Sequence, residues 1–88
     1  MELRLLHYFA TLAEELHFGR AAQRLCISQP PLSVAIKQLE QELQAQLFER
    51  SSKGVRLTAA GEHLLGKARQ LLALSHQAAQ ETRDVAQG

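Results

Sequence analysis

Two adjacent prolines, Pro30 and Pro31, stand at the start of a segment in which apolar residues recur at helical spacing. Proline fixes the backbone φ angle and has no N–H group, so it fits the first turn of an α-helix and disrupts later turns. Ser28, just before the pair, is a residue type that favours the N-cap of a helix. We therefore predict a helix from about Pro30 to Leu43. Its apolar stripe consists of Leu32, Ala35, Ile36, Leu39 and Leu43.

The chain before the prolines contains two further helical patterns. Apolar residues recur at helical spacing over residues 3–16, and a shorter pattern of about two turns covers residues 18–25. Only a few residues separate this second helix from the one that begins at the prolines, so the two must cross steeply. The small side chains of Ala21 and Ala22 allow a close approach. This pattern predicts a helix-turn-helix.

Alternating apolar and polar residues follow, which is typical of short strands. Residues 46–50 and 54–57 alternate on either side of a polar tip, and they predict a two-stranded hairpin, or wing. A lone hairpin is only marginally stable in water. We therefore expect Leu47 and Leu57 to point into the helical core.

A long last helix is predicted from Thr58 onward. Thr58 is a suitable N-cap, Gly61 is expected to be the weak position, and neither Pro nor Gly interrupts residues 67–87. Its apolar and small residues follow heptad spacing, and a helix this long cannot bury them all on so small a head. We expect it to pair with a second copy of the chain. The expected dimer residues are Leu64, Leu65, Ala68, Leu71, Leu72, Ser75, Ala78, Ala79, Thr82 and Val85.

Together these elements predict a mainly α fold. A winged helix-turn-helix of three helices and a two-stranded wing, in residues 1–58, is followed by a linker and dimerisation helix in residues 59–88. With 88 residues, of which 45% are hydrophobic, the chain can form such a core. Domains of this size often gain further apolar burial from a partner subunit, which also favours a homodimer.

Positive charge is concentrated in the middle of the chain. The formal net charge of the whole chain is only +1. Residues 17–56 hold six Lys and Arg against three Glu, which gives +3, and the rest of the chain carries −2. The helix-turn-helix and wing are therefore the part that could face phosphate groups.

Other classes of function lack their residue patterns here. No His lies three or four residues from another His or from Cys26, so we expect no metal and no cofactor. No nucleophile motif or phosphate-binding glycine loop is present, and we expect no enzymatic activity. Cys26 falls in the turn between helices, where we expect a buried structural thiol. Charged residues interrupt the apolar residues near the start, so we expect no signal peptide, no membrane span and no membrane contact. A single cysteine excludes an internal disulfide, and we expect a reducing cytoplasmic location.

A series of short motifs covers nearly all of residues 1–64. They are Met1-Glu2-Leu3-Arg4 with Tyr8-Phe9, Phe18-Gly19-Arg20-Ala21-Ala22, Leu25-Cys26-Ile27-Ser28-Gln29-Pro30-Pro31-Leu32-Ser33, Leu39-Glu40-Gln41-Glu42-Leu43, Leu47-Phe48-Glu49-Arg50 and Leu57-Thr58-Ala59-Ala60-Gly61-Glu62. In order and spacing this series resembles the N-terminal domain of the LysR-type transcriptional regulators. A helix-turn-helix pattern alone would be much weaker evidence than the whole series.

The resemblance implies a bacterial transcription regulator whose winged head binds double-stranded DNA sequence-specifically as a homodimer. Dimer symmetry then implies an inverted-repeat operator. The family also has a larger C-terminal domain that binds a small-molecule inducer. That effector-binding domain is absent from these 88 residues, so we expect the chain to be either a fragment of a longer regulator or a natural truncation, and we favour the fragment. The Pro30-Pro31 pair and the opening residues are similar to members that control aromatic-compound catabolism.

We expect the helix that begins at the prolines to enter the major groove with its first turn and outer face. Gln29 can hydrogen-bond to an adenine edge, and Pro30 and Pro31 offer apolar contact to a thymine methyl group. The resemblance also implies base contacts at the start of this helix. Ser33 and Lys37 are better suited to phosphates, which fix the register of the protein on DNA.

Val34 departs from the family pattern. Many members carry Arg at this position, which can reach a guanine, whereas Val34 can contact only a thymine methyl group or nothing. Gln38, on the same face, is a second candidate for base contact. In the wing, the resemblance implies that Lys53 at the tip, with Arg50 and Arg56 on the strands, approaches the adjacent minor groove. For Arg56 a solvated hairpin surface is an equally good interpretation.

Two alternatives stay open at this point. Arg20 and Arg24, on the second helix, either contact the DNA backbone or pair with Glu40 or Glu42. The fold as a whole could instead be a winged-helix protein-interaction module, or a coiled-coil adaptor in which residues 59–87 are the working part. Neither of these would show salt-dependent affinity for duplex DNA.

Overall fold

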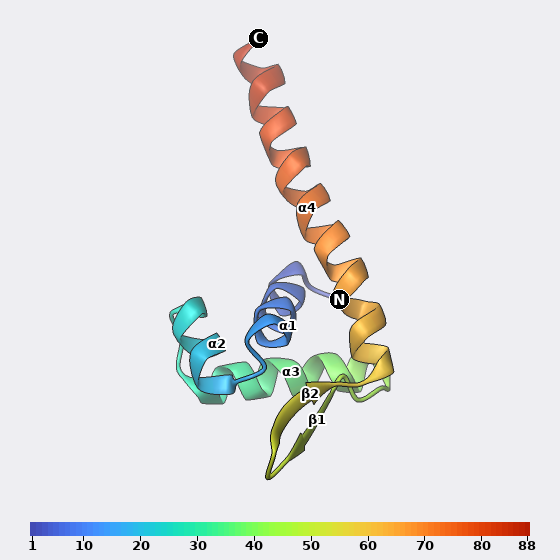
Figure 1. Cartoon of the computed structure of the whole chain (residues 1–88). Coiled ribbons are helices and arrows are strands. Elements are labelled where there is room, and N and C mark those ends of the chain that lie inside the picture. Colours follow the sequence, from blue (N-terminus) through green and yellow to red (C-terminus); the bar gives the residue numbers. More distant parts are fainter.

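The structure, a computed structural model, describes all 88 residues. The elements are α1 (Leu3–Glu15), α2 (Phe18–Leu25), α3 (Gln29–Leu43), β1 (Phe48–Ser51), β2 (Gly54–Leu57) and α4 (Ala59–Gln87). Figure 1 shows a small head from which most of α4 projects as a single helix, and the molecule measures 55 × 25 × 19 Å. This architecture confirms the predicted winged helix-turn-helix with a long C-terminal helix.

The core of the head is assembled around α1. The main cluster contains 15 buried residues and draws on every helix and on β1, with α1 supplying more of them than any other element. Phe9 of α1 is fully buried, and its ring lies 5.4 Å from the ring of Phe48 at the start of β1. The wing is therefore joined to the helical core by an aromatic contact.

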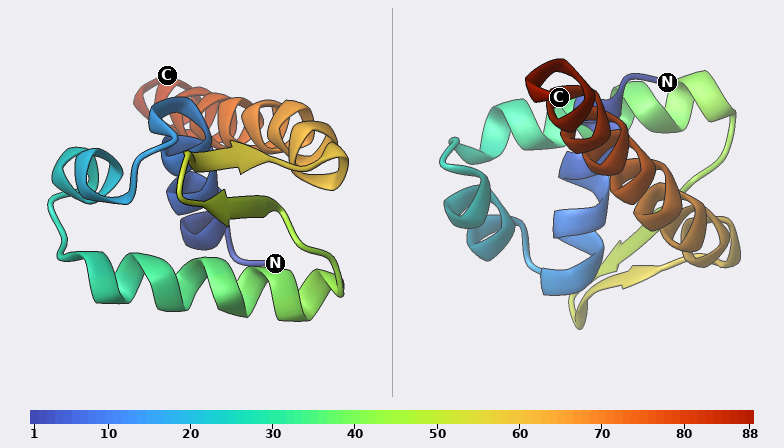
Figure 2. Two further views of the ribbon diagram at one scale, coloured as in Figure 1. Left: turned by 60° about the horizontal axis from the view of Figure 1, so that its bottom comes forward. Right: turned by 90° about the horizontal axis from the view of Figure 1, so that it is seen from above.

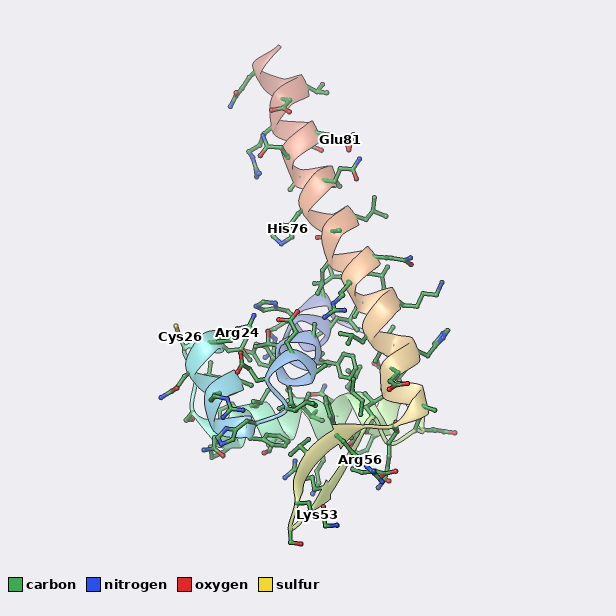
Figure 3. All side chains as sticks on the ribbon, viewed as in Figure 1. Arg24, Cys26, Lys53, Arg56, His76 and Glu81 are labelled. Carbon is green, nitrogen blue, oxygen red and sulfur yellow. The ribbon has the colours of Figure 1, made fainter.

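The turn between α2 and α3 consists of residues 26–28. Ala21 and Ala22 of α2 are buried, as their small size predicted. Cys26 ends α2 in the left-handed conformation (φ 57°), and the amide of Ile27 donates to the carbonyl of Ala22 at 3.0 Å. The prediction of a buried Cys26 is wrong: the thiol is exposed, at the outer edge of the head (Figure 3). The turn depends on the backbone of this residue, so its side chain is left in solvent.

The wing is an antiparallel hairpin in which Phe48 pairs with Leu57. Gly54 follows the tip with φ +118°, a conformation open to glycine and strained for other residues. Leu47 is buried and Leu57 half-buried against the core, as predicted. β1 begins later than the predicted residue 46, because the amide of Leu47 donates to the carboxylate of Glu40 at 2.8 Å.

The start of α4 is fixed against the wing. The side chain of Thr58 accepts a hydrogen bond from the amide of Gly61 at 3.0 Å, which confirms the predicted cap. Gly61 is buried, and a Cβ at this position would collide with the carbonyl oxygen of Leu47. The residue expected to weaken the helix is therefore the one that lets the helix approach the wing.

α4 belongs to the head over about its first three turns. Leu64 and Ala68 are members of the core cluster, so the packed head extends beyond residue 58, where the sequence placed its boundary. Figure 2, right, shows α4 crossing over α1 and continuing past it. Beyond Ala68 no residue of α4 is buried. None of the helices combines the length and the apolar composition needed to cross a membrane.

Candidate nucleic-acid interface

The first turn of α3 is exposed, and the side chain of Gln29 lies beside Gly19 at the start of α2. Gln29, Pro30 and Pro31 are all exposed, and α3 lies along one side of the head (Figure 2, left). Ser28 occupies the N-cap position but makes no side-chain cap bond, contrary to the expectation. An N-cap side chain normally accepts from the second or third helical N–H, and here Pro30 and Pro31 have none to donate.

The outer face of α3 borders a groove of about 650 Å³ that lies between α3 and the wing. Ser33, Val34 and Lys37 line this groove from α3, and Arg50 lines it from β1. Val34 is 64% exposed, so its methyl groups are not used in the protein core. Gln38 is exposed on α3 but is not among the groove residues. The structure thus places four of the nine predicted contact residues around one groove, with Gln38 beside it, while Gln29, Pro30 and Pro31 lie in the exposed first turn of α3.

Lys53 stands at the tip of the wing, well away from the helices (Figure 3). Its amide donates to the hydroxyl of Ser51 at 3.1 Å, which closes the turn and leaves the ammonium group free. Arg56 behaves differently, because it faces Glu49 across the hairpin and donates to its carboxylate at 3.0 and 2.9 Å. Of the three wing cations, Arg56 is the one with a carboxylate partner, and Lys53 has none.

The side chain of Arg50 extends toward α2 and not toward the wing tip. Its guanidinium lies over the ring of Phe18, the first residue of α2, at 3.9 Å from the ring centroid. Phe18 was predicted only as the first residue of a short helical pattern, with no part in the site. No periodicity could have linked it to Arg50, since the contact exists only once the hairpin has folded back beside the helix-turn-helix.

Arg20 and Arg24 are engaged with two carboxylates at the end of α1. Arg24 lies 2.9 Å from Glu14 and 3.1 Å from Glu15, and Arg20 lies 3.3 Å from Glu15. Hydrogen bonds to Glu14, then Glu15, raise the pKa of Arg24 above its ordinary value. Arg69 of α4 extends the network at 3.6 Å from Glu14. These arginines therefore connect α1, α2 and α4 within the head.

Glu40 and Glu42, considered as partners for those arginines, have other contacts. The carboxylate of Glu40 accepts from the amides of Leu47 and Phe48 at 2.8 and 3.4 Å. Glu42 lies 3.4 Å from the amino group of Met1. Glu40 is thus the residue that ties the end of α3 to the start of the wing, and so sets where the two stand relative to each other. Nothing in its sequence pattern signals this role.

The predicted dimer residues fall into three groups by burial. Leu64 and Ala68 are buried in the core of their own head, so these two are corrected to core residues, because α4 covers α1 at this point. Leu65 and Leu72 are half-buried. The other predicted residues are exposed: Leu71, Ser75, Ala78, Ala79, Thr82 and Val85.

Leu74 is an exposed apolar residue that the predicted seam left out. It is 60% exposed, compared with 41% for Leu71 and 81% for Val85. At 100° per residue, Leu71, Leu74, Ala78 and Val85 lie on one side of α4. On the same projection Leu64 lies about 20° from Leu71, so the free apolar face continues the side of α4 that Leu64 defines, with a small rotation in each heptad.

The comparisons with known proteins agree with this geometry. The family model for "Bacterial regulatory helix-turn-helix protein, lysR family" matches residues 3–62. The HTH-type transcriptional regulator YnfL of Escherichia coli is 52% identical over all of this chain and 30% of its own length. TfdT of Cupriavidus pinatubonensis, also an HTH-type transcriptional regulator, is 51% identical over all of this chain and 39% of its own length. The chain thus spans 30–39% of these curated relatives.

A solved structure matches the fold closely. The "BenM_DBD/catB site 1 DNA Complex" has a TM-score of 0.96 at 45% identity, over 100% of this chain and 99% of that one. The match includes the wing and α4, so it extends beyond the helix-turn-helix. The motif series, the fold and the family match over residues 3–62 together show that the chain belongs to the lysR family of bacterial regulatory helix-turn-helix proteins.

Proposed function

We propose that this chain is the DNA-binding part of a bacterial transcription regulator and that it binds double-stranded DNA sequence-specifically as a homodimer. The observation that carries the proposal is the exposed first turn of α3, next to a groove whose cations Lys37 and Arg50 form no ion pair. Glu40 and Glu49 also line this groove, but their carboxylates accept from the amides at the start of the wing and from Arg56. A helix with a free leading turn fits the major groove of B-DNA. The chain of the BenM DNA complex, which superposes on all of this one, supports the proposal.

Direct base contact is assigned to the leading turn of α3. Gln29 would bind an adenine edge, and Pro30 and Pro31 would contact a thymine methyl group. Val34 is proposed to meet a second methyl group, since its own methyls are exposed and have no partner in the chain. Gln38 would add a polar contact at the edge of the site. Replacing thymine by uracil in the operator removes only that methyl group, which isolates the apolar contacts.

The remaining contacts are assigned to the DNA backbone and the minor groove. Ser33 and Lys37, which line the groove beside α3, suit phosphates. Lys53 at the wing tip is proposed to reach the adjacent minor groove. Arg56 is left out of the proposal, because Glu49 already accepts both of its hydrogen bonds.

Dimerisation is assigned to the exposed part of α4. The proposed contacts are Leu65, Leu71, Leu72, Leu74, Ser75, Ala78, Ala79, Thr82 and Val85. Two heads joined through this helix would read two halves of an inverted repeat. Joining them also raises the effective concentration of the second head once the first has bound.

We also propose the domain content, location and role of the whole regulator. It would carry a C-terminal domain that binds a small-molecule inducer, it would act on the chromosome in the cytoplasm, and its role would be regulatory rather than catalytic. The chain's coverage of only 30–39% of its relatives leaves room for such a domain. Control of an aromatic-catabolism operon is proposed from the Pro30-Pro31 pair and the opening residues.

The test is a selection of short duplexes from a random pool by the 88-residue chain, followed by titration of the selected duplexes at two salt concentrations. We expect an inverted repeat, with half-sites about one helical turn or a multiple of it apart. The log of the affinity should fall with log salt by about 0.9 for each phosphate contacted.

Gln29→Ala is the diagnostic variant, with Gln80→Ala on the outer part of α4 as its matched control. Gln29→Ala should weaken binding and leave dimerisation unchanged, whereas Gln80→Ala should leave the affinity of a single head unchanged. Selection of no sequence, together with no salt-dependent affinity, would reject DNA binding in favour of a protein-interaction module or an adaptor.

A further inference from the structure

Arg50 and Phe18 form a contact between the wing and the helix-turn-helix. The carbon at the centre of the Arg50 guanidinium lies 3.9 Å from the centroid of the Phe18 ring. Phe18 is half-buried and packed against the core, so the ring is a fixed support. A guanidinium over an aromatic face is held by cation–π attraction. The side chain of Arg50 is therefore oriented by the fold, although it is itself exposed.

The charge of Arg50 is uncompensated, unlike that of the other arginines of the head. A carboxylate lies within 4.0 Å of each of those others, namely Arg4, Arg20, Arg24, Arg56 and Arg69. Arg50 forms no such pair, and its sequence neighbour Glu49 is bound to Arg56. The fold thus fixes this one guanidinium in place without neutralising it.

The geometry of the pair leaves the hydrogen-bonding edge of the guanidinium available. Stacking uses the flat face of the group, while its N–H donors point outward in the plane. Two parallel N–H donors match the oxygens of a phosphate, and the bonds are strengthened by the opposite charges. Ser33 and Lys37 line the same groove and supply a hydroxyl and an ammonium group, which suit the same ligand. The two carboxylates of the groove, Glu40 and Glu49, are already bound, to the amide of Leu47 and to Arg56.

We infer that Arg50 binds a DNA backbone phosphate beside the groove that receives α3, and that Phe18 is the positioning residue that holds its guanidinium for this contact. The inference rests on the proposed function, and it separates Arg50 from the wing tip and the minor groove. A phosphate held here would lie between α2, α3 and β1. It would therefore fix the recognition helix and the wing on the DNA at the same time.

The test is a double-mutant cycle on duplex binding. Phe18→Leu and Arg50→Ala are made singly and together, and their affinities are measured with the selected duplex at several salt concentrations. Phe18→Tyr, which keeps the ring, is the control. Thermal unfolding of each variant identifies a temperature at which all of them are folded, so that a loss of fold is not read as a loss of contact.

Phe18→Leu should weaken binding about two- to fivefold per head when Arg50 is present, and should have no further effect in the Arg50→Ala background. Phe18→Tyr should bind like the parent chain. Arg50→Ala should lower the salt slope by about 0.9 per head, as expected for one lost phosphate contact. Arg50→Lys should keep that slope but bind more weakly, because an ammonium group neither stacks as a plane nor binds in two-pronged fashion.

Two results overturn the inference alone. An equal effect of Phe18→Leu with and without Arg50 would show that the ring serves only the core. An unchanged salt slope in Arg50→Ala would show that no phosphate is bound there. If the parent chain shows no salt-dependent affinity for any duplex, the proposed function itself fails, and that outcome is seen before any variant is compared.

Discussion

The head and the outer part of α4 are both helical, yet they are stabilised in different ways. The head closes a core of 15 buried residues, whereas α4 has no buried residue beyond Ala68. The outer helix is supported by local bonds such as Gln80 to Asp84 at 3.0 Å. Local bonds add little, because most helix stability in proteins comes from packing. The stability of the head is thus a property of one chain, and that of the outer helix depends on what covers it.

The heptad pattern of α4 is divided between these two regions. Its first members, Leu64 and Ala68, are buried in the core of the head, and the later ones, such as Leu71 and Val85, remain exposed. Because α4 is one uninterrupted helix, its packing in the head also fixes the orientation of the exposed apolar face beyond the head. If that face pairs with a second copy, as proposed, the position of Leu64 in the core sets the angle at which two heads are held.

The largest difference between the regions should appear when one leucine is truncated in each. Leu64→Ala removes a side chain that is 9% exposed and should lower the free energy of unfolding by about 2–5 kcal/mol. Leu74→Ala removes one that is 60% exposed and should change it by less than about 0.5 kcal/mol in the monomer. Urea denaturation at low chain concentration measures both.

For self-association we expect the opposite order, with Leu74→Ala having the larger effect and Leu64→Ala the smaller one. Leu74→Ala should raise the dissociation constant of the dimer, measured by analytical ultracentrifugation, because it removes apolar area that only a partner can cover. Leu64→Ala should leave that constant nearly unchanged for the folded chain. Similar unfolding losses for both variants in the monomer would show that the outer helix is not independent of the head.

A second prediction compares the two glycines of α4. Gly61→Ala forces a Cβ against the backbone of Leu47 and should destabilise the head by about 1–3 kcal/mol. Gly66→Ala adds a Cβ that meets nothing within 4 Å and should stabilise the helix by about 0.4–1 kcal/mol. Thermal unfolding should therefore shift in opposite directions. A gain from both would mean that the approach of α4 to the wing can relax.

These glycines also show how far a sequence can be interpreted alone. Apolar spacing predicted every helix and the hairpin, because burial of one face is encoded locally in the order of residues. The role of Gly61 was inverted, since only the packed structure reveals that the Leu47 carbonyl occupies the place of its side chain. The buried thiol predicted at Cys26 failed for the opposite reason, because the turn needs its backbone and not its side chain.

In the candidate interface, too, the features set by local sequence were predicted and those set by tertiary contacts were not. The leading turn of α3 was found from Pro30 and Pro31, whose backbone preferences are local. The partners of the charged residues were not found, because they depend on which elements meet in space. Glu40 bonds the start of the wing rather than an arginine, and Arg50 stacks on Phe18. Residue type gives the chemistry of a side chain, whereas the fold decides whether that chemistry is already used.

The smallest expected effect concerns the only ion pair between the head and the outer helix. Arg69 lies 3.6 Å from Glu14, and both side chains are substantially exposed. Arg69→Gln should therefore lower the free energy of unfolding by no more than about 1 kcal/mol, and less at high salt. Arg83→Gln, near the end of α4, is the matched control, because its guanidinium donates only to Gln80 within the same helix.

The pH dependence of this network distinguishes charge from packing. The pKa of Arg24 is raised, so its contribution to stability is present at every pH below the ordinary value and is lost only as the pH rises through the raised value. That range lies far above neutrality, so the contribution of Arg24 to stability should be constant across neutral pH. The effect of Arg69→Gln should fall with added salt. A loss as large as that of Leu64→Ala that also falls with added salt would mean that charge rather than burial fixes α4 to the head. A loss insensitive to salt would mean that Arg69 acts through packing and not through its charge. Leu64 and Ala68, which precede Arg69 in α4, are already buried in the core of the head. We therefore expect their burial to fix the orientation of α4 and the ion pair between Arg69 and Glu14 to add only a little stability.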